Sequence, residues 1–109
     1  MPELSDKEKK LLEDIKDYLN ITWEEERTNK NLAGMMKRGM KRLQKIAGVS
    51  SLDFTEEDIE RELLFDYCRY ANSNALEVFE VNFIGSLQDL HFKYQARSLG
   101  QNEGDSSAN

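Results

Sequence analysis

Few side chains in this sequence belong to the types that perform catalysis. The chain has one histidine, His91, and one cysteine, Cys68. His91 could act as a general base and Cys68 as a nucleophile, but each would need a polar partner to activate it. His91 has no obvious partner, and Cys68 lies among apolar residues of an expected helix. We therefore interpret His91 as a polar residue on a helix flank and Cys68 as a buried structural thiol.

Two short runs of carboxylates, at residues 24–26 and 56–58, are the other candidates for a chemical site. Adjacent residues fan out around a helix end, so these carboxylates would not converge on a metal ion. They are typical of solvated helix starts, where negative charge suits the positive end of the helix dipole. The sequence also contains no nucleotide-binding loop, zinc-protease or nucleophile-elbow motif. We expect no catalytic residue, no metal ligand and no cofactor, and hence not an enzyme.

A set of basic residues recurs at helical spacing between positions 28 and 47. At 100° per residue they occupy an arc of about 140° on one side of a helix. The members are Lys30, Lys37, Arg38, Lys41, Arg42 and Lys45. Such a face could contact nucleic-acid phosphates, with strong salt dependence. It carries no aromatic, Asn or Gln side chain to read bases, and the sequence pI is about 4.8. The alternatives that we favour are a solvated face or a face that pairs with acids of another subunit.

The net charge of −6 conceals blocks of opposite sign. Residues 1–26 carry four basic and nine acidic side chains, whereas residues 27–52 carry seven basic and no acidic ones. Residues 53–66 carry one basic and seven acidic side chains, and residues 67–109 carry three and five. This segregation predicts electrostatic complementarity, either within the fold or between subunits.

The elements that position these residues are all expected to be helices. Strand signals are scarce, and the only proline is at position 2. We predict a small bundle of three to four helices in one domain, residues 1–97, with a flexible tail, residues 98–109. The expected helices are 6–20, 28–47, a third from a cap at Thr55 to about 71, and a fourth over 74–97. Ser5 with Glu8 forms a capping box, Gly48 ends the second helix, and residues 72–74 mark a kink or break. Trp23 is expected to plug the joint between the first two helices.

The targeting features of the sequence are few. No run of apolar residues is long enough to span a membrane, and the charged start is unlike a signal peptide. One cysteine excludes an internal disulfide and fits a reducing cytosol.

The expected helix over 74–97 has apolar residues on two sides. One stripe runs through Leu76, Phe79, Phe83, Leu87, Leu90 and Tyr94 and should face the core. The opposite side carries a second group, which we predict to be an interface with another subunit together with Phe65 of the third helix. That group is Val78, Val81, Gly85 and Phe92. The alternative is that these residues contact the first helix or its connector within one subunit.

Four segments together resemble a known family. They are DIKDYLNITWEEE at 14–26, KRLQKIAG at 41–48, LDF at 52–54 and RELLFDYCRYANSNALEVFEVNF at 61–83. Over residues 11–95 the chain resembles the head–tail connector (adaptor) proteins of long-tailed phages and prophages, some of them described as DNA-packaging proteins. Of the four segments, the fourth carries the most specific part of this resemblance.

The resemblance implies a virion structural protein with no catalytic residues. Such connectors form a ring, usually of twelve copies, beneath the portal of the filled capsid, where they extend the DNA channel and receive a head-completion (stopper) or tail protein. DNA would pass through without sequence-specific binding. The protein would reside at the head–tail interface of the virion, and in the bacterial host cytoplasm before assembly. Two other functions stay open: a small DNA-binding or packaging-associated protein that uses the basic helix, and a monomeric helical adaptor for a soluble host partner.

Overall fold

The protein is all-α, as the sequence predicts. The computed structural model describes the backbone of residues 4–108 and the side chains of residues 4–98. This part contains no strand, and its main helices are α1 (Asp6–Tyr18), α2 (Glu26–Ala47), α3 (Ile59–Asn72) and α5 (Ile84–Ala108). A 3-10 turn, η1 (Leu76–Val78), and the single turn α4 (Phe79–Asn82) join α3 to α5.

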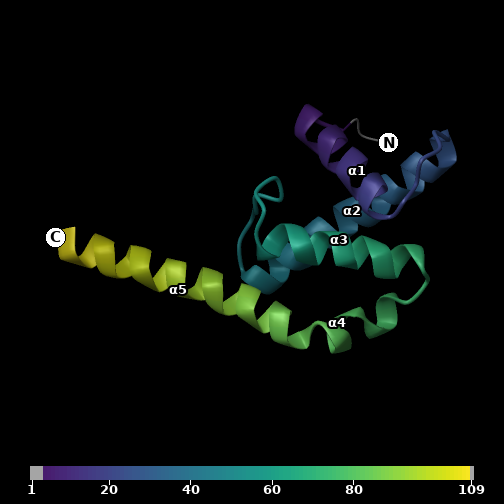
Figure 1. Cartoon of the computed structure of the whole chain (residues 1–109). Helices are drawn as coiled ribbons and strands as arrows, with labels where there is room; N and C mark the ends of the chain where they lie inside the picture. The colour runs from purple at the N-terminus through teal and green to yellow at the C-terminus, as the bar shows by residue number, and fades with distance from the viewer. Residues whose placement is uncertain (1–3, 109) are drawn as a thin grey trace.

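The body of the molecule is built on the packing of α2 against α3 (Figure 1). α1 covers one end of this pair, and the first half of α5 packs along both helices. The second half of α5 extends away from the body, which makes the molecule elongated, with extents of 55 × 31 × 23 Å. The core is a single apolar cluster that includes Ile15, Met36, Leu64, Phe79 and Leu90, all fully buried. Within residues 4–108 no helix is both long enough and apolar enough to cross a membrane.

Gly39 sets the distance between α2 and α3. A methyl group at this position would lie 2.7 Å from Cδ1 of Tyr67 and 2.9 Å from Cδ1 of Leu64. Both distances are shorter than carbon atoms tolerate, so only glycine permits this approach.

Substitution of Gly39 by alanine should therefore destabilise the protein. We expect a loss of about 1–2 kcal/mol, because overpacking outweighs the better helix propensity of alanine. The matched control is Gly85→Ala on α5, where a methyl group meets no atom within 4 Å. That variant should gain about 0.5–1 kcal/mol. Urea unfolding of both variants checks the opposite signs, and equal effects would contradict the packing argument.

The helix ends agree with the sequence at some positions and differ at others. Ser5 and Glu8 form the predicted capping box, and Gly48 ends α2 with a φ of 75°. The predicted cap at Thr55 is wrong, because α3 begins at Ile59 and its N-cap is Asp58. Thr55 instead donates both its backbone N–H and its hydroxyl to the carboxylate of Asp53. A local turn of this kind competes with helix formation and delays its start.

The region after α3 is more broken than the sequence suggests. The predicted break at residues 72–74 is confirmed, since α3 ends at Asn72 and Asn74 has a φ of 55°. A continuous helix over 74–97 is wrong: the chain forms η1 and α4, leaves helical geometry at Phe83, and only then enters α5. Buried Phe79 packs its ring against three neighbouring aromatic rings, which holds this short segment on the core. α5 then runs past the predicted domain boundary at residue 97, to Ala108. The flexibility of residues 98–109 stays a prediction, because their side chains from residue 99 on lie outside the described part.

Candidate interaction surfaces

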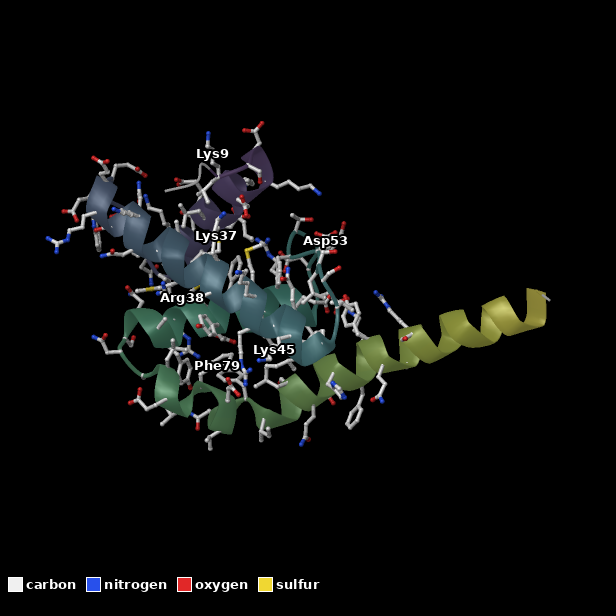
Figure 2. All side chains as sticks on the ribbon, turned by 180° about the vertical axis from the view of Figure 1, so that it is seen from behind. Lys9, Lys37, Arg38, Lys45, Asp53 and Phe79 are labelled. Carbon is white, nitrogen blue, oxygen red and sulfur yellow. The ribbon has the colours of Figure 1, made fainter. Side chains whose placement is uncertain are left out.

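The six basic residues of α2 lie on one side of that helix, as predicted. Figure 2 shows this side, with Lys37, Arg38 and Lys45 along the helix and α3 behind it. The residues at the two edges of this basic face form ion pairs with acids of other elements. Lys37 lies 3.6 Å from Glu8 of α1, and Arg42 makes two hydrogen bonds of 2.7 Å to Glu80 of α4. The centre of the basic face comprises Lys30, Arg38, Lys41 and Lys45, all exposed. None of these four forms an ion pair with an acid in the described part of the chain.

A groove runs between the basic side of α2 and the η1–α4 segment. We call it the α2–α4 groove. Its lining comprises Arg38, Lys41, Arg42, Lys45, Tyr67, Leu76, Glu77 and Glu80. Four cations face two carboxylates, so the groove is positive. The hydrogen bonds from Arg42 lower the pKa of Glu80 below its usual value, and burial raises the pKa of Tyr67. The groove suits an anionic partner.

The Arg42–Glu80 pair predicts a pH dependence of stability. Because the pKa of Glu80 is lowered in the folded protein, the pair stabilises it above the usual Glu pKa of about 4.3, and this contribution is lost as the pH falls. Arg42→Met should therefore lower the melting temperature at pH 7 and have a smaller effect at pH 3. Both side chains are more than a third exposed, so the effect should be modest. Thermal unfolding at the two pH values checks this, and a difference that does not change with pH would contradict it.

A second groove lies between α1 and α3. We call it the α1–α3 groove, and its lining comprises Tyr18, Glu57, Arg61, Glu62, Phe65 and Asp66. The Tyr18 hydroxyl donates to Asp66 at 2.7 Å, which raises the pKa of Tyr18. Three carboxylates face one guanidinium, so this groove is negative. Its lining also includes the aromatic rings of Tyr18 and Phe65. It therefore has the opposite charge to the α2–α4 groove.

Phe65 belongs to this second groove and not to the group in which the sequence placed it. Its ring lies 5.5 Å from that of Tyr18, and the guanidinium of Arg61 lies 4.5 Å above it. Phe65 is half-buried by these contacts with α1. Grouping it with Val78 and Phe92 is wrong, because Phe65 faces α1 whereas those residues belong to η1 and α5.

The other four members of the predicted interface are exposed. Val78 is 41%, Val81 73% and Phe92 60% exposed, and Gly85 has open space around it. The opposite stripe is buried or half-buried, so its predicted role in the core is confirmed. The structure adds Ile84, which is 56% exposed. We call Val78, Val81, Ile84, Gly85 and Phe92 the apolar strip. Val78, Val81 and Phe92 stay exposed, so the alternative, contact with the first helix or its connector within one subunit, is met only by Phe65, which packs against Tyr18 of α1.

Sequence reasoning missed two further exposed aromatic side chains. Tyr18 is 46% exposed although it falls on the apolar stripe of α1. Trp23 is 53% exposed, so its predicted role as a plug between helices is wrong. The connector is held instead by Lys16, which is buried and donates to Glu24, and by Ile21, which is also buried. The sequence carries no signal for this link, because the burial of Lys16 is visible only in the structure.

A polar cluster ties the start of α3 to α5. Glu60 is 4% exposed and accepts hydrogen bonds from Lys93 at 2.7 Å and from the Tyr94 hydroxyl at 2.9 Å. Lys93 also donates to Asp58 at 2.9 Å, and this bond lowers the pKa of Asp58. Each polar group therefore has a charged partner, as burial requires. The cluster has a structural role and offers no open position to a substrate.

The side chains that could do chemistry have structural surroundings. His91 Nδ1 lies 2.9 Å from the carbonyl oxygen of Ile46, and because a carbonyl only accepts, Nδ1 is the donor. Cys68 is fully buried, and burial raises the pKa of its thiol to about 12, which suppresses the reactive thiolate. Among the described side chains, no three His, Cys, Asp or Glu residues gather where they could hold a metal ion.

Comparison of the chain with family models, with curated proteins and with solved structures gives no match.

Proposed function

We propose that this protein is a virion structural protein, a head–tail connector that forms a ring beneath the portal and joins the filled capsid to the tail. The observation that supports the proposal is that the described part of the chain exposes three separate surfaces of different chemistry. These are the basic α2–α4 groove, the acidic α1–α3 groove and the apolar strip. A subunit of a ring needs two different surfaces for its two neighbours and a third for the protein on which the ring docks.

Under this proposal the apolar strip meets the portal or an adjacent subunit. Val81, Ile84 and Phe92 are large apolar side chains that are more than half exposed, so they are available for contact with a partner. The projecting half of α5 could reach beyond the body of one subunit to its neighbours (Figure 1). DNA would pass through the ring without tight binding, which suits a chain with a net charge of −6.

Electron microscopy of the protein with its cognate portal tests this proposal. We expect rings at the portal vertex, and we expect the double variant Val81→Asp/Phe92→Asp to reduce docking strongly because it places charge in the apolar strip. Ser50→Asp/Ser51→Asp, which adds two carboxylates and the same net charge at exposed positions outside the apolar strip, is the matched control. Absence of the protein from the vertex, or normal tailed particles formed without it, would refute the proposal.

Direct DNA binding is a second candidate because the centre of the basic face lacks partners within the described part. A titration of duplex DNA against salt separates the two functions. Binding with a steep salt dependence that Lys41→Ala/Lys45→Ala removes would favour it. No binding at low salt would eliminate it.

A further inference from the structure

We propose that the α2–α4 groove of one copy binds the α1–α3 groove of a second copy, in a head-to-tail contact between basic and acidic surfaces. The inference rests on the assembly that the proposed function requires, and it names the residues that make the contact. Lys41 and Lys45 belong to the α2–α4 groove of one copy, and Glu57 and Glu62 belong to the α1–α3 groove of the other.

The two grooves match in charge and in chemistry. Four cations against two carboxylates line the first, and three carboxylates against one guanidinium line the second. The acidic groove also has Tyr18 and Phe65 in its floor, and aromatic faces attract Lys and Arg side chains. Glu57 is 86% exposed although it pairs with Arg61 at 3.3 Å, and Glu62 is exposed and has no ion pair in the described part. Lys41 and Lys45 also have no ion-pair partner there, so each side offers charge to a partner.

The two surfaces cannot meet within one molecule. Gly39 of α2 and Leu64 of α3 mark the line where these helices touch. Lys41 follows Gly39 by two residues, and Glu62 precedes Leu64 by two, so each points about 200° away from the contact. Lys41 and Glu62 therefore lie on opposite sides of the α2–α3 pair. A contact between two such surfaces is heterologous: it leaves one groove of each kind free and continues into a ring or a chain rather than stopping at a dimer.

A second copy fits the basic face better than a nucleic acid does. Glu8 pairs with one edge of the face, and Glu77 and Glu80 line the other. These carboxylates would repel a continuous phosphate backbone laid across the helix, whereas a compact acidic patch can fit between them. The absence of base-reading side chains on this face agrees with a protein partner.

Charge reversal tests the contact with no portal present. The first variant is Lys41→Glu/Lys45→Glu, and the second is Glu57→Lys/Glu62→Lys. The control, Lys7→Glu/Lys9→Glu, changes net charge as the first variant does but at exposed positions outside both grooves. All six positions are exposed, and circular dichroism of each variant verifies the fold.

Sedimentation velocity and native mass spectrometry at low ionic strength provide the readout. We expect the wild type to form species larger than a dimer, and salt to dissociate them by screening the contact. Each reversal variant alone should associate about tenfold more weakly or worse, while the control should keep most of its association. An equimolar mixture of the two reversal variants should assemble again, because each acidic surface then meets a basic one.

Three results would overturn the proposal. They are a wild type that stays monomeric at the highest soluble concentration, a first variant no weaker than the control, and a mixture that fails to assemble. A monomeric wild type whose first variant loses only DNA binding would assign the basic face to nucleic acid. Assembly that depends on these residues but shows no docking on a portal would leave the contact intact and refute the proposed function.

Discussion

Replacement of Phe79 by alanine is expected to lower the free energy of unfolding by about 3–5 kcal/mol. Phe79 is fully buried, and its ring lies 5.4 Å from that of Tyr67, 5.7 Å from Tyr70 and 5.0 Å from Phe83. Alanine would remove all three aromatic contacts and leave a cavity in the core. The hydrogen bonds that also hold the η1–α4 segment, from Arg42 to Glu80 and from Asn82 to Tyr70, are exposed, so the segment should be held less firmly on α2 and α3.

Denaturant unfolding followed by circular dichroism measures this effect. Phe92→Ala is the matched control, because it deletes the same side chain at a position that is 60% exposed. The control should cost no more than about 0.5 kcal/mol, as is usual for surface substitutions. Equal losses in the two variants would mean that Phe92 is covered in solution, for example by a second copy. A dependence of the Phe92→Ala effect on protein concentration would identify that case.

Lys93→Met is expected to have the second-largest effect, a loss of about 2–4 kcal/mol. Lys93 is the only cation within hydrogen-bonding distance of the buried carboxylate of Glu60, among the described residues. Without it, that charge keeps the Tyr94 hydroxyl as its one remaining hydrogen-bond donor. A buried charge without its counter-ion is much less favourable than an apolar group in the same place.

The double variant Lys93→Met/Glu60→Leu separates loss of the pair from loss of packing. If the penalty comes from the unpaired carboxylate, the double variant should recover most of the stability that Lys93→Met loses. Thermal and denaturant unfolding of the two variants give the comparison. A double variant that is less stable than the single one would contradict this account and would show that the pair itself stabilises the junction between α3 and α5.

Much of the architecture follows from the sequence because it depends on local patterns. The capping box at Ser5, the glycine at the end of α2 and the one-sided placement of the six basic residues all depend on neighbours within a helical turn or on regular spacing. The break after Asn72 follows from three residues that are poor in helix interiors.

The errors concern features that depend on tertiary contacts. The two apolar stripes over residues 74–97 imply one continuous helix axis, but the packing of Phe79 and the turn at Phe83 divide that segment. Phe65 was assigned to the wrong surface because its partner, Tyr18, is 47 residues away in the sequence. The exposure of Trp23 and Ile84 depends on where other helices end, which no periodicity reveals. The two oppositely charged grooves likewise require knowledge of which helix faces which, whereas the charge blocks in the sequence predict only that surfaces of opposite charge exist.

Because Cys68 is buried, its reactivity can report local unfolding around α3. The thiol is the only one in the sequence, has no exposed surface, and has a pKa of about 12 in the folded state. An alkylating reagent should therefore modify it only when α3 separates from its neighbours. When reclosing is faster than labelling, the ratio of its labelling rate to that of a free thiol gives the equilibrium constant for that opening. A labelling rate that falls as the protein concentration rises would then measure how much the contact between copies stabilises the folded core. This measurement uses the native cysteine and needs no introduced residue.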